Sequence, residues 1–252
     1  MSEPLIVIED LQKSFGKQTI LDHLNLTINR GDSVVIIGQS GTGKSVLLKH
    51  LIRLMDPDGG RILFDGKDIS QLESRDLVAL RLRFGMLFQS AALFDSMTVE
   101  ENVGLGLKES RQYGSDEIHT IVLEKLEMVG LVEAAEKYPS ELSGGMRKRV
   151  GLARAIAHNP EVLLYDEPTT GLDPITSDVI NDLIVDLNNK LKVTSITVTH
   201  DMISAFKVAN RIVMLHQGKV EFDGTPTDTF STQNPFVRQF IAGNAAGPIQ
   251  VR

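Results

Sequence analysis

Eight residues of this sequence have the types and spacing of a loop that binds phosphate groups. Residues 38–45 read Gly-Gln-Ser-Gly-Thr-Gly-Lys-Ser and match the pattern G-x-x-x-x-G-K-[ST]. The glycines let successive backbone N–H groups converge on an anion, and the N-terminus of a following helix adds partial positive charge. In such a loop the Lys44 ammonium reaches the terminal phosphates and the Ser45 hydroxyl ligates Mg²⁺. A glycine-rich turn that binds nothing is the alternative.

The residues on both sides of this loop favour phosphate binding. Residues 33–37 form a short apolar run typical of a buried strand, and residues 46–55 carry apolar side chains at helical spacing. A strand, the loop and a helix in this order are the context that the pattern requires.

Two carboxylates follow a second apolar run. Residues 162–165 read Val-Leu-Leu-Tyr and lead directly into Asp166 and Glu167. Ligands of parallel sheets collect at the carboxyl ends of the strands, so Asp166 is a candidate Mg²⁺ ligand. Glu167 is placed to orient a water molecule or accept its proton, which favours hydrolysis over transfer of the phosphate to another substrate. Two surface acids in a turn before Pro168 are the alternative.

Two more polar residues end predicted strands. His200 follows residues 195–199, and we expect it at the same sheet edge as Asp166, within reach of a γ-phosphate. A structural histidine is the alternative. Gln89 follows the strand-like residues 84–88 and can bind Mg²⁺ or water through its carbonyl oxygen.

Residues 142–146, Leu-Ser-Gly-Gly-Met, precede a basic helical run. Ser143 at a helix start, followed by two glycines, predicts a second helix N-terminus that can bind an anion. One γ-phosphate needs only one phosphate loop. We therefore expect this second site to close on a nucleotide held by another copy of the chain. An ordinary capped helix is the alternative.

The composition narrows the class of protein. The chain has 252 residues, of which 42% are hydrophobic and 23% charged, as in ordinary globular proteins. The net charge of −7 argues against a nucleic-acid partner, and the lack of cysteine excludes disulfides. No apolar run approaches the roughly 20 residues of a membrane span, and the N-terminus lacks a secretory pattern. We expect a soluble, cytoplasmic chain that needs a partner for any work in a membrane.

The remaining pattern predicts an α/β fold. Residues 5–8 and 24–28 read as strands of an opening β part, and residues 97–154 read as a helical block. Strand-like runs also occur at 162–165, 195–198 and 212–215, with helical spacing between the first two. Strands rich in β-branched residues that alternate with helices indicate a parallel sheet. Residues 234–252 contain Gly-Asn-Ala-Ala-Gly-Pro and are expected to form an extended tail.

The order of the motifs resembles that of the ATP-binding cassette (ABC) family. The motifs are the phosphate loop, Gln89, Leu-Ser-Gly-Gly-Met at 142–146, Leu-Leu-Tyr-Asp-Glu at 163–167, Gly-Leu-Asp at 171–173 and His200. The resemblance covers residues 5–225. It implies an α/β P-loop NTPase core with a mostly parallel sheet, an N-terminal antiparallel β part and an α-helical subdomain. The core would be residues 1–90 and 155–233, the helical subdomain 91–154, and the tail 234–252 would reach the partner subunit.

The resemblance also implies an ATPase that uses ATP and Mg²⁺ and acts as a head-to-tail dimer of two copies. Its implied catalytic residues are Glu167, His200 (the γ-phosphate contact), Lys44 and Gln89. Phe15 falls where the family places an aromatic ring that stacks on adenine, and Asp173 lies in the loop that communicates across the dimer. The implied metal ligands are Ser45, Gln89 and Asp166. The implied nucleotide-binding residues are Phe15, Gly38, Gln39, Ser40, Gly41, Thr42, Gly43, Lys44, Ser45, Val46, Ser143, Gly144, Gly145 and Asp173.

One residue departs from the family pattern. Met146 stands where the commoner signature has glutamine, and a thioether cannot replace the amide hydrogen bonds. The contacts expected of Ser143 and the backbone do not depend on that side chain, so we expect activity to be retained.

Three segments are further similar to the ATPases of Mla-type, MCE-associated lipid transporters, namely residues 88–99, 144–150 and 236–249. This similarity implies phospholipid transport that maintains outer-membrane lipid asymmetry. The implied partners are a multispan permease, an MCE-domain lipid-binding protein and, in some systems, a small regulatory subunit. The implied location is the cytoplasmic face of the inner membrane. A soluble ABC ATPase in assembly, an ABC ATPase for another substrate and a P-loop kinase are the alternatives.

Overall fold

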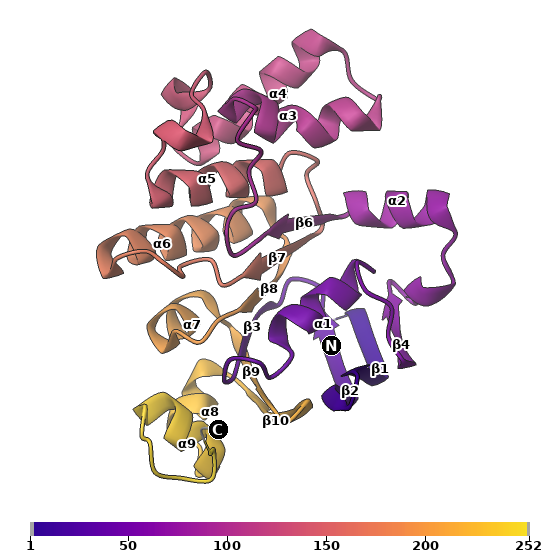
Figure 1. The fold of residues 1–252 in the computed structure, drawn as a ribbon, viewed down its shortest axis with the longest axis vertical. Helices are drawn as coiled ribbons and strands as arrows, with labels where there is room; N and C mark the ends of the chain where they lie inside the picture. Colours follow the sequence, from indigo (N-terminus) through magenta and orange to yellow (C-terminus); the bar gives the residue numbers. More distant parts are fainter. Residues whose placement is uncertain (1–2, 251–252) are drawn as a thin grey trace. The chain divides into compact units, whose positions relative to one another are not determined.

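The structure is a computed structural model, and it describes residues 3–250. These residues form two compact units (Figure 1). The first contains the residues up to Val78 and those from Ile196 onward, and the second is Ala79–Ser195. The predicted helical subdomain, residues 91–154, lies within the second unit, and its boundaries stay a prediction.

The elements of the first unit come from both ends of the chain. They are β1 (Pro4–Phe15), β2 (Gln18–Asn29), β3 (Ser33–Ile37), α1 (Lys44–Leu51), β4 (Gly59–Phe64), β5 (Lys67–Asp68), the 3₁₀ turn η1 (Ile69–Gln71), α7 (Met202–Val208), β9 (Arg211–His216), β10 (Lys219–Gly224), α8 (Pro226–Ser231) and α9 (Pro235–Ala242). Helix α2 (Ser74–Leu82) and strand β8 (Thr194–Val198) contain the boundaries between the units.

An antiparallel sheet opens the chain, with the strand order β2-β1-β4-β5. Leu24, Leu26 and Ile28 of β2 are buried, whereas Asn25 and Thr27 between them are not. This alternation is that of a sheet with one buried face. The predicted N-terminal antiparallel β part is confirmed.

The other sheet of the first unit has β3 at its centre, in the order β10-β9-β3-β8. Strand β3 pairs in parallel with β9 and is fully buried from Val34 to Ile37, and α7 packs on it. Strand β10 pairs antiparallel with β9. A strand with a continuous apolar run is covered on both faces, which is why residues 33–37 do not alternate.

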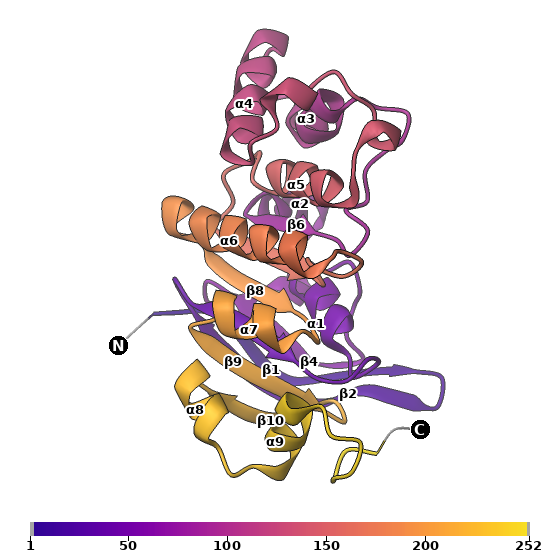
Figure 2. The ribbon, with the colours of Figure 1, turned by 90° about the vertical axis from the view of Figure 1, so that its left-hand side faces the viewer.

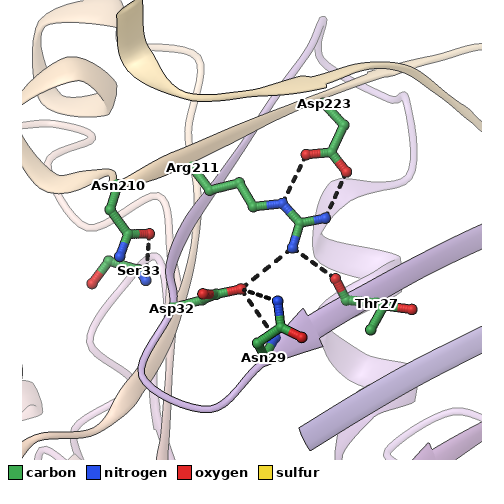
Figure 3. Close-up of polar contacts among 7 residues, drawn as sticks. All are labelled: Thr27, Asn29, Asp32, Ser33, Asn210, Arg211 and Asp223. Carbon is green, nitrogen blue, oxygen red and sulfur yellow. Dashed lines mark hydrogen bonds and ion pairs between the residues drawn. The ribbon is translucent and has the colours of Figure 1, made fainter. Parts of the chain in front are cut away.

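Arg211 ties these two sheets together (Figure 3). Its guanidinium donates two hydrogen bonds to the carboxylate of Asp223 on β10, at 2.7 and 2.6 Å. The same group donates to the carbonyl oxygen of Thr27 on β2 and to Asp32, at 2.8 and 3.3 Å. Bidentate pairs of this kind are strong and directional. They fix the turn before β3, and β3 leads into the phosphate loop.

The second unit consists of a strand pair and several helices. Its elements are β6 (Phe84–Leu87), α3 (Val99–Ser110), α4 (Ser115–Met128), the 3₁₀ turns η2 (Val132–Ala134) and η3 (Pro139–Glu141), α5 (Gly144–Ala155), β7 (Val162–Asp166) and α6 (Pro174–Leu191). Strands β6 and β7 are parallel. Helices α5 and α6 lie side by side in both views (Figures 1 and 2). The helical block predicted for 97–154 is confirmed as α3, α4 and α5.

Two predicted elements differ from the observed ones. The helix predicted for 46–55 ends at Leu51, because Arg53 adopts a left-handed backbone (φ 50°) that stops the helix. The extended tail predicted for 234–252 is wrong for the described residues, since Pro235–Ala242 form α9, near α8 and β10 (Figure 2). Asn234 caps α9 by accepting from the backbone N–H groups of Phe236 and Val237.

The segment after α9 turns back on that helix. The side-chain amide of Gln239 donates to the carbonyl oxygen of Ile249 at 3.0 Å and accepts from its N–H at 2.7 Å. Ile249 is buried as a result. The predicted reach of this segment to a partner subunit stays a prediction, and residues 251–252 lie outside the described residues.

No helix among residues 3–250 combines the length and apolar character that crossing a bilayer requires.

His50 makes the stability of the first unit depend on pH. Its Nδ1–H donates to the carbonyl oxygen of Val46 at 2.7 Å, and its Nε2 is buried without a hydrogen-bond partner in the described part of the chain. Burial lowers the pKa of His50 below its usual 6.5, so the unfolded chain takes up the proton first as the pH falls. This contribution to stability is present above pH 6.5 and is lost below it.

We therefore expect the urea midpoint of unfolding to be lower at about pH 5.5 than at about pH 7.5, and expect this difference to shrink in His50→Gln. Burial also lowers the pKa of His158, which acts in the same direction. His119→Gln is the control, because Glu100 raises the pKa of His119 and its loss should enlarge the difference. An unchanged difference in His50→Gln would contradict the assignment.

Candidate nucleotide-binding site

The predicted phosphate loop connects β3 to α1 and has the backbone that such a loop needs. Gly38, Gly41 and Gly43 have φ values of 150°, 82° and 95°, which side-chain-bearing residues rarely adopt. A Cβ atom at Gly38 would lie 2.5 Å from the carbonyl oxygen of Leu215, so any larger residue would move the loop. Gly43 is the N-cap of α1, so no side chain caps this helix, and its first turn contains no acidic residue. This helix start suits an anion.

Lys44 is the first residue of α1, and its side chain is buried, with the residue only 6% exposed. Its ammonium donates to the carbonyl oxygens of Gly38 and Gln39, at 2.7 and 2.9 Å. The hydroxyl of Thr42 donates to the same Gln39 oxygen at 2.8 Å. The loop is thereby closed around a positive charge at a helix N-terminus. These features fit the phosphate chain of a nucleotide.

His200 lies at the same sheet edge as this loop. It follows β8 directly after Thr199, whose N–H donates to the carbonyl oxygen of Ile36 in β3 at 3.1 Å. The carboxyl ends of β3 and β8 therefore meet, and His200 is exposed beside them. Its contact with a γ-phosphate stays a prediction.

Phe15, the expected adenine-stacking residue, is the last residue of β1 and pairs with Gln18 of β2. The ring is 48% exposed, and the Lys13 ammonium lies 5.8 Å from its centre. An exposed ring of this kind has surface available for stacking. Its contact with adenine stays a prediction.

In the second unit, the two predicted acids end strand β7. Asp166 is its last residue and is buried. Glu167 follows with a left-handed backbone (φ 49°) although it precedes Pro168, a position that favours extended backbone. The Thr170 hydroxyl donates to Glu167 Oε2 at 3.0 Å and orients the carboxylate. Strained, oriented residues of this kind are concentrated at functional sites.

Ser143 is the N-cap of α5, as its position predicted. Its hydroxyl oxygen accepts from the N–H of Met146 at 3.3 Å and keeps its own proton to donate elsewhere. The Met146 side chain has no part in this cap, so the departure from the family pattern leaves the cap intact. A Cβ atom at Gly145 would lie 2.6 Å from Thr176 Cγ2, so this glycine also lets α5 approach α6, a role the sequence did not reveal.

Asp173 caps a helix, a role that its motif did not predict. It is the N-cap of α6 and accepts from the N–H groups of Ile175 and Thr176, each at 3.0 Å. The hydrogen bonds from Thr176 lower the pKa of Asp173 below its usual value. The carboxylate is therefore ionised and fixed at a helix start, and its part in contacts across a dimer stays a prediction.

Gln89 is exposed in the turn after β6, and its backbone oxygen accepts from the ammonium of Lys148 at 2.5 Å. Lys148 lies on α5 and also donates to the carbonyl oxygen of Glu167 at 3.1 Å. Burial lowers the pKa of Lys148 to about 8, while the charges of Asp166 and Glu167 act in the opposite direction. The sequence showed only a basic run here. The signal that could have identified Lys148 is a cation on a helical face that is otherwise buried, because position 148 shares a face with Gly145 and Leu152.

The predicted metal ligands are oxygen donors of three kinds. Ser45 lies in the first turn of α1, Asp166 ends β7, and Gln89 follows β6. Mg²⁺ takes a few protein oxygens of this kind and completes its octahedron with water and phosphate oxygens. Among residues 3–250, no three His, Cys, Asp or Glu side chains form a metal cluster of their own. The chemistry of each of these donors suits Mg²⁺, and their part in binding it stays a prediction.

Comparison with known proteins decides the family. The model of the ABC transporter family matches residues 21–170, which contain the phosphate loop, the Leu-Ser-Gly-Gly-Met segment and both acids. The chain belongs to this family. It is an ATP-binding and ATP-hydrolysing subunit of an ABC transporter, and the kinase interpretation is set aside.

Curated relatives match almost the full length of this ABC ATPase. It is 42% identical to the intermembrane phospholipid transport system ATP-binding protein MlaF of Haemophilus influenzae, over 100% of this chain and 96% of that protein. It is also 42% identical to MlaF of Escherichia coli K12, over 98% and 92%. A "probable ribonucleotide transport ATP-binding protein mkl" of Mycobacterium leprae is 42% identical over 97% of this chain and 70% of its own length.

Solved structures agree with the predicted fold class. The ATP-binding cassette MJ0796, solved as a dimer in a post-hydrolysis state with ADP and Pi, matches with a TM-score of 0.80 and 33% identity, over 88% of this chain and 99% of that one. CbiO1 of Clostridium perfringens, part of the ABC transporter complex cbiONQ, matches with a TM-score of 0.83 and 31% identity, over 92% of each chain. The predicted ABC ATPase fold is confirmed.

Proposed function

We propose that this ABC ATPase energises a phospholipid transporter. The observation that carries the proposal is the end-to-end match to the MlaF phospholipid transport proteins, which leaves almost no part of either chain unmatched. The mkl protein has the same sequence identity of 42% to this chain, and its printed name refers to ribonucleotides. However, only 70% of its length is matched. The full-length correspondence favours phospholipid.

In the proposed cycle, ATP and Mg²⁺ are held between two copies of the chain in a head-to-tail dimer. The loop 38–43 and Lys44 bind the phosphates at the start of α1, where no side-chain cap competes with them. The start of α5 in the second copy, with Ser143, Gly144 and Gly145, binds the same γ-phosphate from the other side. The Ser143 hydroxyl retains a proton to donate, which supports this role.

The remaining roles are assigned by the chemistry of each side chain. Ser45, Gln89 and Asp166 would hold Mg²⁺, which neutralises developing charge on the phosphates when bound.

Glu167 accepts the proton of the attacking water, and His200 contacts the γ-phosphate. Phe15 stacks on adenine, and Asp173 lies near the junction of the two copies. The hydrogen bond that Glu167 accepts from Thr170 and the strained backbone of Glu167 support its role as the proton acceptor.

The proposed partners are a multispan permease, an MCE-domain lipid-binding protein and a small regulatory subunit. The proposed location is the cytoplasmic face of the inner membrane, where the chain is peripheral and held by the permease. The MlaF relatives are described as ATP-binding proteins of an intermembrane phospholipid transport system, which supports a multi-component assembly for lipid.

The proposal is tested on the chain purified from membranes of its own host. We expect a multispan subunit and bound phospholipid to co-purify, identified by mass spectrometry. After reconstitution into phospholipid vesicles, the complex should hydrolyse ATP, and added ribonucleosides should leave the rate unchanged. Lys44→Ala should yield the same complex without hydrolysis. Recovery of soluble partners only, or hydrolysis stimulated by ribonucleosides without bound lipid, would overturn the phospholipid assignment.

A further inference from the structure

Two cations of α5 hold the segment that follows β6. Lys148 donates to the carbonyl oxygen of Gln89 at 2.5 Å. Arg154, near the other end of the helix, donates to the carbonyl oxygens of Ala91 and Ala92, at 2.6 and 2.7 Å. Residues 89–92 are therefore bound by their backbone to a single helix.

This segment has a backbone that needs such support. Ala91 and Ala92 both lie in the left-handed region, with φ values of 61° and 48°. Consecutive left-handed residues that carry a Cβ persist only where their surroundings hold them. Ala91 is buried, and a Cβ atom at Gly151 of α5 would lie 3.3 Å from Ala91 Cβ and 2.6 Å from Leu87 Cδ1. The helix thus supplies both the cations and the space that this conformation requires.

Lys148 makes a second connection. Its ammonium also donates to the carbonyl oxygen of Glu167 at 3.1 Å, in the turn that follows β7. Strands β6 and β7 are parallel neighbours, so the turns after them lie at the same sheet edge. One ammonium, on a residue that is only 5% exposed, therefore joins the turn of Gln89, the turn of Glu167 and the helix that Ser143 caps.

We propose that Lys148 is a positioning residue for ATP hydrolysis, which couples Gln89 and Glu167 to the α5 helix. A displacement of α5 as Ser143 meets the partner's nucleotide would move both turns with it. The proposal rests on the roles proposed above for Gln89 and Glu167. It predicts that loss of the ammonium misplaces the attacking water and the metal ligand while the phosphate loop still binds ATP.

The test compares Lys148→Met, Lys148→Arg and the control Lys125→Met. Methionine keeps the unbranched stem of the side chain, one atom shorter, and loses its donors, whereas arginine restores donors. Lys125 is a matched control, because it is a buried lysine of α4 whose ammonium donates to Asn159 and Glu124, outside the proposed machinery. We expect Lys148→Met to lower kcat about 10- to 100-fold, the scale of a misplaced reacting group, with little change in KM or in the Kd for a fluorescent ATP analogue.

Lys148→Arg should recover most of kcat, and Lys125→Met should lower the thermal midpoint without a comparable loss of kcat. Hydrogen exchange of the peptide covering residues 88–93 should be faster in Lys148→Met alone. A kcat of Lys148→Met equal to that of the wild type, or a loss matched by Lys125→Met, would overturn the proposal. If Lys148→Met does not fold, Lys148→Gln is scored on the same measurements. Failure of the role proposed for Glu167 is distinguished by Glu167→Gln, which would then hydrolyse ATP at the wild-type rate, and failure of the phospholipid assignment by the absence of bound lipid from the purified complex.

Discussion

Replacement of Lys44 by alanine is expected to abolish measurable ATP hydrolysis. The Lys44 ammonium is buried under the loop and bound to the carbonyl oxygens of Gly38 and Gln39, so its charge is already in place before ATP arrives. A preorganised cation beside the developing phosphate charge costs no reorganisation during the reaction, and removing one such donor costs about 10²–10³ in rate. The measurement is phosphate release under saturating ATP and Mg²⁺.

The matched control is Lys49→Ala, which removes a lysine from the last turn of the same helix. We expect it to retain the wild-type rate. Both alanine variants should remain folded, because alanine is the best helix former and the glycines that shape the loop are unchanged. Substantial hydrolysis by Lys44→Ala would show that the loop is not the phosphate site.

The parts of the fold that could be predicted have local signals. An apolar run before the phosphate loop is a buried strand because β3 is covered on both faces, and the alternation at 24–28 marks a sheet with one buried face. The tail could not be predicted in the same way. Its glycine-rich end indicated extended chain, but Gln239 binds the backbone of Ile249 ten residues later, and this contact exists only in the folded structure.

The features of the candidate site likewise separate into those with a local sequence pattern and those without one. Residue types at fixed spacing were enough to single out Lys44, Asp166, Glu167 and Ser143. They could not reveal that Lys148 reaches two carbonyl oxygens far away in the sequence. The left-handed backbone of Glu167 was equally hidden, since a residue before proline favours extended backbone. Interactions with distant backbone atoms leave no pattern in one sequence, except a cation on an otherwise buried helical face.

Replacement of Glu167 by glutamine is expected to leave ATP binding intact and to slow hydrolysis about 10²–10⁴-fold, which is the usual contribution of a general base. The amide has almost the shape of the carboxylate, and its oxygen can still accept from the hydroxyl of Thr170. It cannot accept a proton from water. The bound nucleotide should therefore remain ATP, and the two copies should stay closed around it. The measurements are single-turnover hydrolysis and molar mass from light scattering with and without ATP.

Glu133→Gln is the control, since it removes an exposed carboxylate of the same unit from the 3₁₀ turn η2. It should hydrolyse ATP at the wild-type rate and show no dimer that persists after turnover. The two outcomes of Glu167→Gln test different claims. A wild-type rate would remove Glu167 from the reaction, whereas slow hydrolysis by a variant that stays monomeric with bound ATP would contradict the head-to-tail dimer. In the dimer, the start of α5 completes the other copy's site, so trapped ATP and trapped dimer must appear together.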